Sequence, residues 1–388
     1  MRTRIIDSLK CVERSAWNAL ALGGNPFLRH EFLAALETAG CAGPGTGWQA
    51  CHLLLEDERG ALVAAVPLYL KSHSWGEFVF DWSWANAYAR AGLDYYPKLV
   101  SAIPFTPAPG PRLLIAPQAD RAQVRTLLLS ALRGLARAHG VSSLHVLFTA
   151  AEDQTALLEA GFLPRKDCQF HWYNRGYASF ADYLATFRAD KRKKVRRERR
   201  RVAEQGIHFD TLTGEALDAQ LWRDIHALTA GTFHRRGHEH YLSADFFTAL
   251  ARKQPESIMV KLATLHGRSV AAAVFFVGAD TLYGRYWGAH EEFHSLHFET
   301  CYYQGIEFCI ERGLTRFEPG TQGEHKVARG FEPTATWSAH FIADPRFARA
   351  IRQYLVEEAK AVDAYMRDVR SHLPFHREEA SGTDTAVR

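Results

Sequence analysis

YGRYWGAHEEFHSLHFETCYYQGIEFCIERGLTRFEPGTQGEHKVARGF, residues 283–331, is the stretch that decides the fold. Its order predicts a strand, a polar turn, an amphipathic helix, a short strand and a loop with several glycines. From residue 296 to residue 312 apolar side chains recur at mixed three- and four-residue steps, which is typical of a helix packed on a sheet. Gly313 is expected to end this helix.

The short segment 314–318 predicts a buried strand, and Pro319 and Gly320 release the chain into a loop at its C-terminal end. Open α/β sheets place ligands at such strand ends. An acid, an imidazole and two cations follow within six residues of that loop: Glu324, His325, Lys326 and Arg329. A functional site is therefore expected here first.

Length and composition predict a soluble protein of two domains. A chain of 388 residues exceeds one ordinary core, and 47% apolar with 23% charged residues is typical of globular proteins. No run approaches the roughly 20 apolar residues of a membrane span. The N-terminus lacks the apolar segment of a signal peptide. The net charge of +4 excludes a nucleic-acid footprint over the whole surface.

The cysteines have neither the paired spacing of a metal site nor that of a disulfide framework. There are six of them: Cys11, Cys41, Cys51, Cys168, Cys301 and Cys309. This usage predicts a reduced cytoplasmic location and no bound metal.

The rest of the chain alternates strand and helix patterns and predicts an α/β class with a mixed sheet. Helices are expected at 25–38, 119–139, 152–160, 216–229 and 346–370, and strands at 48–55, 61–71, 98–103, 112–115, 142–148, from 207, 257–265, 270–277 and 281–287. The first two strands should form a hairpin. The final residues have the composition of a frayed tail.

An aromatic tract, residues 78–96, mixes Trp and Tyr with Asp81, Asn86 and Arg90 beyond what a core strand needs. Packing under a long loop accounts for it, and a ligand-binding wall is the alternative.

The segment 179–205 begins with one apolar face and continues as a basic helix. It carries ten Lys or Arg between Arg188 and Arg201 against two acids. Such a run is often a solvated helix face. The functional interpretation is a helix between domains that binds polyphosphate or tRNA through Lys193, Lys194 and Arg197.

Two short matches indicate an internal duplication. GALVAAV from Gly60 matches GRSVAAA from Gly267, and GVSSLHV from Gly140 occupies the same helix-to-strand junction as GLTRFEP from Gly313. They occur in the same order, which favours two copies of one α/β unit. We expect domains at 1–178 and 206–345, the basic connecting helix at 179–205, and a C-terminal helix and tail at 346–388.

Several of these stretches resemble a known family. GEHKVARGF after the FEPG strand, LHFETCYYQ before it, the RYWG strand and residues 80–114 are similar to the FemAB-like family, described as peptidoglycan biosynthesis/recognition proteins, within the GNAT acyltransferase superfamily. The resemblance extends from about residue 25 to residue 355. It implies tandem GNAT-like domains that transfer an aminoacyl group from aminoacyl-tRNA to the amine of a peptidoglycan precursor.

The resemblance has two departures. The family's Lys-x-Gly-Phe is similar to residues 326–331, but here Ala328 and Arg329 stand between Val327 and Gly330. The pyrophosphate loop of GNAT domains that use acetyl-CoA is absent before Leu296, where the turn is GAHEEFHS. Acyl-CoA is therefore the less favoured co-substrate, and an aminoacyl ester or another carrier is preferred.

Acyl transfer to an amine needs a proton acceptor, donors for the oxyanion and cations for anionic parts of the substrate. Glu318, Glu324 and His325 are the candidate bases. The candidate substrate-binding residues are Arg285, Trp287, His297, Glu299, Tyr302, Tyr303, Lys326 and Arg329, with Arg235, Arg236 and Tyr241 as an opposite wall. For any single one, a structural salt bridge or a capped loop is the alternative.

Residues 290–294 read His-Glu-Glu-Phe-His and match the zinc-protease pattern HExxH. That pattern belongs on a helix, whereas these residues are predicted to form a turn after a strand. A metal site is therefore not expected.

The sequence thus predicts a transferase that acylates or aminoacylates an amine, without a firmly assigned cofactor. The alternative is a non-catalytic module of the same fold that binds peptidoglycan or nucleotide-sugar ligands.

Overall fold

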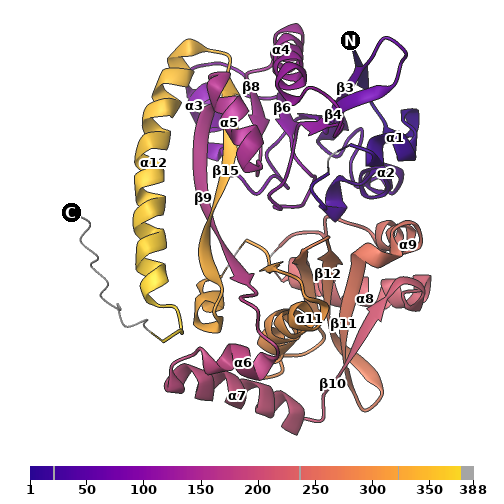
Figure 1. Ribbon diagram of the computed structural model, residues 1–388, viewed down its shortest axis with the longest axis vertical. Coiled ribbons are helices and arrows are strands. Elements are labelled where there is room, and N and C mark those ends of the chain that lie inside the picture. The colour runs from indigo at the N-terminus through magenta and orange to yellow at the C-terminus, as the bar shows by residue number, and fades with distance from the viewer. Residues whose placement is uncertain (21, 236, 322, 377–388) are drawn as a thin grey trace, which may run out of the picture.

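Two long strands in the middle of the molecule join its two halves (Figure 1). The computed structural model describes residues 1–20, 22–235, 237–321 and 323–376. In these residues eleven strands form one mixed sheet, in the spatial order β10 (His208–Thr213), β11 (Ile258–Leu265), β12 (Arg268–Val277), β13 (Thr281–Ala289), β14 (Arg316–Glu318), β9 (Leu163–Tyr173), β15 (Glu332–Ile342), β8 (Ser143–Val146), β6 (Lys98–Ser101), β5 (Tyr69–Lys71) and β2 (Trp48–Ala50).

A second, smaller sheet belongs to the N-terminal half. Its order is β1 (Arg2–Ile6), β3 (His52–Glu56), β4 (Leu62–Val66) and β7 (Leu114–Ile115). The predicted hairpin is confirmed by the antiparallel pairing of β3 with β4. The strands expected at 48–55 and 61–71 are each broken, because β2 and β5 leave this sheet for the large one.

Helices cover both sheets. They are α1 (Arg14–Asn18), α2 (His30–Thr38), α3 (Trp82–Arg90), α4 (Arg121–Ala138), α5 (Ala151–Glu159), α6 (Phe180–Ala185), α7 (Ala189–Glu204), α8 (Ala219–His234), α9 (Ala244–Lys253), α10 (Leu296–Phe298), α11 (Gln304–Arg312) and α12 (Pro345–Ser371). Among the described helices none is long and apolar enough to cross a membrane.

The two halves repeat one pattern. In the C-terminal half β13 pairs with β14 in parallel, and in the N-terminal half β6 pairs with β8 in parallel. The junctions after Gly313 and Gly140 lead into β14 and β8, as the sequence matches indicate. Gly313 has φ 67° and ends α11 in the left-handed conformation that glycine permits.

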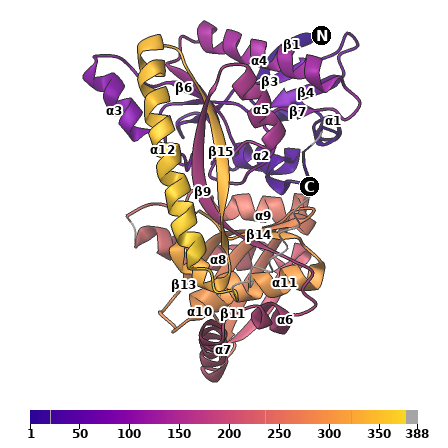
Figure 2. The ribbon, with the colours of Figure 1, turned by 60° about the vertical axis from the view of Figure 1, so that its left-hand side comes forward.

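Strands β9 and β15 each run from one half of the molecule into the other. β15 follows the C-terminal half in sequence, yet residues 339–342 pair with β8 of the N-terminal half. Most of β15 pairs with β9, and Tyr173 and Trp172 at the end of β9 pair with β14. α12 runs along both strands, as Figure 2 shows. There Arg165 of β9 contacts Glu358 at 2.8 Å.

Several elements differ from the sequence prediction. The helix expected from residue 25 is a 3₁₀ turn, Pro26–Leu28, with Asn25 accepting from the Phe27 N–H, and α2 begins only at His30. The helix expected over 179–205 is broken at residues 186–188 into α6 and α7. α9, β9 and β15 were not predicted.

The halves also share a core, which fixes their relative position. The ring of Phe27 lies 4.9 Å from Phe276 and 5.0 Å from Tyr283. On the same face of β13, α8 of the C-terminal half lies so close to Gly288 that a Cβ there would sit 1.9 Å from the Leu228 carbonyl oxygen. The Phe27 contacts hold β13 against the N-terminal half, and residues further along β13 line a cavity.

Candidate active site

A cavity of about 920 Å³ lies where β13 and β14 separate. The two strands pair as far as Tyr283 and Glu318; β14 then ends, and the chain turns away at Pro319. The separation of two parallel strands opens a ligand site at their C-terminal ends. The cavity is lined from the C-terminal half by residues of β12, β13, α10, the π-helical turn Glu299–Tyr303 and the 319–326 loop, and from the N-terminal half by residues 74–82 and 105–107.

A β-bulge in β13 directs several consecutive residues into this cavity. The register with β12 changes from Val274↔Tyr286 to Phe275↔Gly284, so that Arg285 has no partner residue. A regular strand would turn alternate residues away. Here residues 284 to 287 all line the cavity.

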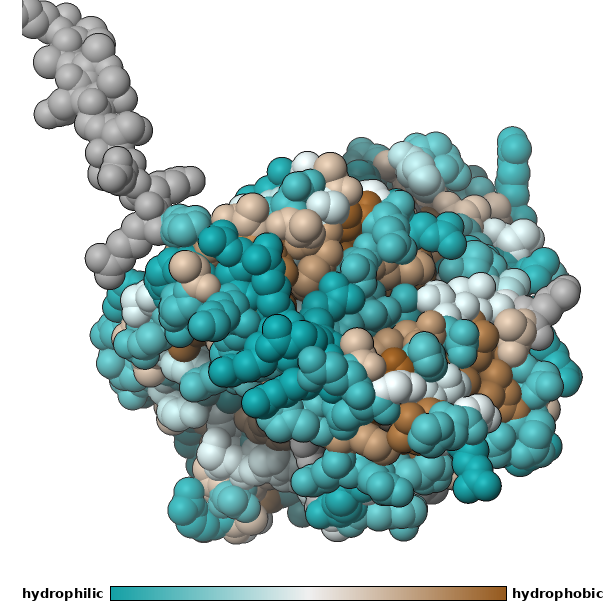
Figure 3. Space-filling view, turned by 90° about the horizontal axis from the view of Figure 1, so that it is seen from below, coloured by the Kyte–Doolittle hydropathy of each residue, from teal (hydrophilic) through white to brown (hydrophobic). Residues whose placement is uncertain are grey.

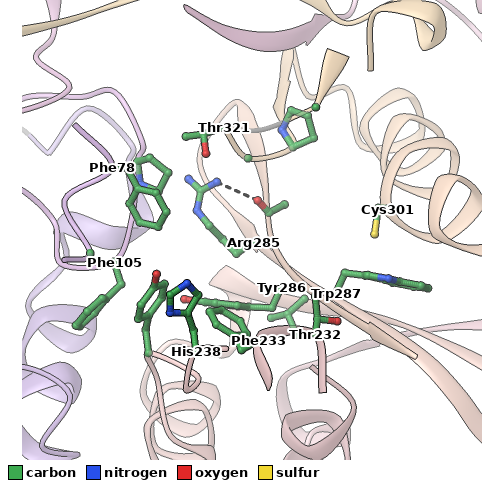
Figure 4. A pocket seen from close by; sticks show the side chains of 18 of the residues that line it. Phe78, Phe105, Thr232, Phe233, His238, Arg285, Tyr286, Trp287, Cys301 and Thr321 are labelled. Atoms are coloured by element: carbon green, nitrogen blue, oxygen red, sulfur yellow. Dashed lines mark hydrogen bonds between the residues drawn. The ribbon is translucent and has the colours of Figure 1, made fainter. Parts of the chain in front are cut away.

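Arg285 offers hydrogen-bond donors that no group of the described residues uses. Its Nη1 donates to the Gly284 carbonyl at 2.9 Å, as drawn in Figure 4, while its buried Nε and Nη2 have no hydrogen-bond partner. The guanidinium lies over the rings of Phe27 and Tyr283. Burial lowers its pKa. A planar cation with free donors is suited to a carboxylate or a phosphate.

Lys326 is a second buried cation at the cavity. It is 1% exposed, and its Nζ donates to the Gly320 carbonyl at 2.6 Å. Burial lowers its pKa to about 7, and Arg285 contributes in the same direction. Any negative charge that approaches Nζ would favour the ammonium form.

His325 lines the same cavity and is hydrogen-bonded through Nε2 to the Tyr302 hydroxyl at 2.8 Å. Burial lowers the pKa of His325, and the charges of Lys326 and Arg329 lower it further. The imidazole is therefore neutral near pH 7. The ring packs so closely on Gly323 that a Cβ there would lie 2.2 Å from it, and Gly323 has φ 107°.

Glu318 lies beside the cavity without lining it. Only 1% of it is exposed, and the Nε of Arg316 is 3.3 Å from Oε1. Within the described part of the chain neither carboxyl oxygen has a hydrogen-bond partner. Burial raises the pKa of Glu318 to about 7, although Arg316 and Arg285 oppose this. The charge of Glu318 raises the pKa of Arg285 and so opposes the effect of burial on that guanidinium.

Other candidates bind the site helix and loop to α7. Glu198 of α7 accepts from the Tyr303 hydroxyl and from Arg329 Nη2 at 2.9 Å. Arg199 contacts Glu299 at 3.1 Å. The guanidinium of Arg329 lies 3.4 Å from the ring centre of Phe298 and donates to the His325 carbonyl. The polar groups of Glu299 and Tyr303 and both Nη atoms of Arg329 are thus already engaged by protein, whereas the buried Nε of Arg329 has no hydrogen-bond partner among the described residues.

The remaining candidates divide between the cavity and the surface. Trp287, His297 and Tyr241 line the cavity. Glu324 is exposed and accepts from the Tyr365 hydroxyl of α12 at 3.0 Å. Arg235 is exposed and donates to Thr232, and Arg236 lies outside the described residues. Lys193, Lys194 and Arg197 are exposed on α7.

The N-terminal half supplies an aromatic wall that was only an alternative in the sequence. Its members all line the cavity: Trp75, Phe78, Phe80, Trp82 and Phe105. Other aromatic residues of the tract are packed in the interior, as the first interpretation predicts: Trp84 and Tyr88 are buried on α3. Of the tract 78–96, Phe78, Phe80 and Trp82 thus line the cavity, while Trp84 and Tyr88 pack in the interior. The signal that separates them is the alternation of aromatic and charged residues in SWGEFVFDW, residues 74–82.

The HExxH residues form no helix. Residues 290–295 make bends and a turn after β13, as expected, and His294 Nε2 is 3.1 Å from Arg201 Nη1. No group of three or more His, Cys, Asp or Glu side chains able to hold a metal ion was found in the described ranges.

Comparison with known proteins gives one family. The family model FemAB_like, described as peptidoglycan biosynthesis/recognition, matches residues 8–377. No curated protein matches the chain.

Solved structures give the fold. The crystal structure of FemX is 12% identical, with TM-score 0.54, covering 91% of this chain and all of that one. L-PGS from Bacillus licheniformis is 10% identical, with TM-score 0.52, covering 82% of this chain and 93% of that one. The C-terminal domain of a putative lysylphosphatidylglycerol synthetase from Agrobacterium fabrum is 10% identical, with TM-score 0.51, covering 81% and 89%. The predicted class, a mixed α/β fold of tandem GNAT-like units, is confirmed.

Proposed function

The chain belongs to the FemAB-like family, and on that premise we propose that it transfers an acyl or aminoacyl group to an amine acceptor resembling a peptidoglycan-precursor peptide. The observation that supports the proposal is the presence, in one cavity, of a neutral imidazole and two buried basic side chains, Arg285 and Lys326, that form no salt bridge with a carboxylate of the described residues. Acyl transfer to an amine needs these groups.

Each group has a proposed role. Arg285 binds a carboxylate or phosphate of a substrate through its free Nε and Nη2. Lys326 stabilises the negative charge that develops on the acyl oxygen, and that charge in turn favours its ammonium form. His325 accepts the proton that the amine loses on attack. Tyr302 orients the His325 ring through the 2.8 Å hydrogen bond.

The reaction then balances without a further reagent. The amine nitrogen forms a bond to the acyl carbon, and the bond from that carbon to the carrier oxygen or sulfur breaks. His325 takes one proton from the nitrogen, and the leaving oxygen or sulfur gains one. Aminoacyl-tRNA and acyl-CoA both fit this scheme, so the donor remains to be identified by experiment.

The basic helix supports a polyanionic donor. α7 turns Val195, Glu198 and Val202 inward, and its exposed cations are Lys193, Lys194, Arg196, Arg197, Arg200 and Arg201. Figure 3 views the end of the molecule where α7 lies, and hydrophilic side chains form a continuous band there. Glu198 and Arg199 connect α7 to the π-helical turn and the 324–329 loop. We propose that this face contacts tRNA or polyphosphate.

The test is incubation of the purified protein with an amine acceptor and, separately, with aminoacyl-tRNA or acyl-CoA, followed by mass spectrometry of the acceptor. We expect a mass increase equal to the acyl group with one of the two donors. Tight acceptor binding with no mass increase from either donor would instead favour a non-catalytic binding module.

A further inference from the structure

Residues 74–82 have the reverse of the polarity that a surface loop normally shows. Ser74, Glu77 and Asp81 are 2 to 3% exposed, whereas Trp75 is 50% exposed and Phe80 is 57% exposed. Charged residues are rarely buried unless they are paired, and large aromatic side chains are usually covered. This loop therefore exposes two large aromatic side chains and buries its polar ones.

A buried ionic network holds the loop in this orientation. Lys98 of β6 is fully buried; its Nζ donates to Ser74 at 2.8 Å, to Glu77 at 2.8 Å, and to Asp81. Ser74 Oγ in turn donates to Asp81 at 2.5 Å. Since removing one partner of such a network leaves a buried charge, the network favours this one arrangement of the loop.

The rings that this network supports face one cavity. Trp75, Phe78, Phe80 and Trp82 line it, and the rings of Trp75 and Trp82 lie 5.2 Å apart. Phe78 and Phe105 both have positive φ, 60° and 57°, which is strained for a bulky side chain. Figure 4 shows both rings on the side of the cavity that faces Arg285 and Tyr286.

The cavity is thus divided by polarity. The N-terminal half contributes aromatic carbon, and the opposite side holds Arg285, His325 and Lys326. His238 lies 5.5 Å from Trp75 and Tyr241 is stacked on Phe105, but none of the described residues that the N-terminal half contributes to the lining is charged. A wall of this kind gains free energy only by covering apolar ligand surface.

We infer that the cavity takes an anionic amphiphile: a carboxylate or phosphate on Arg285, joined to an apolar acyl chain or aromatic ring against the 74–82 wall. This rests on the proposed function, because the apolar part would be the transferred acyl group or a side chain of the acceptor. The substrate would then be larger and more apolar than an acetyl or glycyl group.

The test uses N-acylglycines, which contain an amide, a carboxylate and a variable apolar group. Isothermal titration calorimetry would compare N-acetyl-, N-hexanoyl-, N-decanoyl- and N-phenylacetylglycine below their micelle concentrations. We expect affinity to rise about fourfold per methylene, so that the hexanoyl compound, with four more methylenes, binds about 250-fold more tightly than the acetyl compound. The phenylacetyl arm distinguishes a ring from a chain.

Variants assign each end of the ligand. The double variant Trp75→Ala, Phe80→Ala should reduce the hexanoyl-to-acetyl ratio at least tenfold. Arg285→Met should weaken all four probes by a similar factor and leave that ratio unchanged. Trp337→Ala, which removes an exposed tryptophan on β15 outside the cavity lining, is the matched control and should change neither.

Equal affinity for all chain lengths would overturn the inference, as would an equal loss of the ratio in Trp337→Ala. The proposed function fails separately: graded binding without transfer to any amine would overturn the transferase and leave this inference standing. Transfer of short acyl groups without graded binding would overturn the inference alone.

Discussion

At the scale of the residue, proton transfer in the cavity depends on which base faces the substrate. His325 lines the cavity, and its lowered pKa keeps the imidazole neutral near pH 7. Glu324 and His325 are both exposed, but Glu324 lies outside the cavity lining and accepts a hydrogen bond from Tyr365. Glu318 is buried beside the cavity with a pKa raised to about 7. The geometry favours His325 among the three candidate bases.

We therefore expect His325→Asn to lower kcat by about 10² to 10⁴-fold, because one positioned base contributes that much. In the wild type kcat should fall as pH decreases through a pKa below 6.5, since the protonated imidazole cannot accept a proton. This acid limb should disappear in the variant. Steady-state kinetics from pH 5 to pH 8 measure both effects.

The variant Glu324→Gln tests in the same experiment whether Glu324, rather than its neighbour His325, is the base. It should lose much less activity than His325→Asn and keep the acid limb. An equal loss, with the limb removed, would assign the base to Glu324.

Several residues that the sequence proposed for the site lie in the cavity, because they fall together in one strand-loop segment. Arg285, Trp287, His297, His325 and Lys326 all line the cavity. The sequence could not show that Arg329 is engaged by Glu198, because the two residues are far apart in the chain and meet only through α7. The sequence also could not show that Trp75 and Phe80 face the cavity while other aromatic residues are buried. The orientation of these side chains depends on the hydrogen bonds of Lys98 with Glu77 and Asp81.

At the scale of the element, α7 has two faces with different tasks. Its inner face fixes the site helix and the 324–329 loop, and its outer face is a row of exposed cations. A polyanion that binds the outer face would lie about one helix diameter, roughly 10 Å, from the π-helical turn.

Charge reversal of the outer face tests this role. Lys193→Glu, Lys194→Glu and Arg197→Glu together should weaken tRNA binding at least tenfold, and the logarithm of wild-type affinity should fall linearly with the logarithm of salt concentration. Filter binding from 50 to 300 mM salt measures both. The matched control reverses three exposed arginines of α12, Arg349, Arg352 and Arg367. Salt-independent affinity, or an equal effect of the control, would contradict the proposal that α7 binds tRNA.

Elements with strong helical or hairpin patterns were predictable, including α4, α12 and the helix that ends at Gly313. β9 and β15 were not, because LPRKDCQFHWY and EPTATWSAHFI lack the simple alternation of a half-buried strand. Each passes from one half of the molecule to the other, so its environment changes along its length. Tertiary pairing, rather than local pattern, makes these segments strands.

At the scale of the whole molecule, the junction of the halves contains a buried histidine pair. His145 of β8 and His340 of β15 face each other in register, with their Nδ1 atoms 2.6 Å apart. Burial lowers the pKa of His145 to about 3 and that of His340 well below 6.5; the charge of Lys98 adds to both shifts, and Asp81 opposes the shift of His145.

Between pH 6.5 and pH 3 the unfolded chain binds protons at these rings and the folded chain does not. The free energy of unfolding should therefore decrease as the pH is lowered through this window. His340→Gln removes one such ring. Its deficit in unfolding free energy relative to wild type should shrink as pH falls, by at most about 1.4 kcal/mol per pH unit. Urea unfolding at pH 7.5, 6 and 5 measures the deficit, with the exposed His208→Gln as control. A deficit independent of pH would contradict this origin of acid sensitivity.

The most direct test of the central claim, that the cavity between the halves is the acyl-transfer site, is the transfer rate of Lys326→Met once the donor is known. Burial disfavours the charge of Lys326, so its removal should not lower the thermal unfolding midpoint. The account predicts a fall in kcat/KM of about a hundredfold or more, because a buried oxyanion donor is lost. Transfer at the wild-type rate by a folded Lys326→Met protein would contradict it and place the chemistry elsewhere.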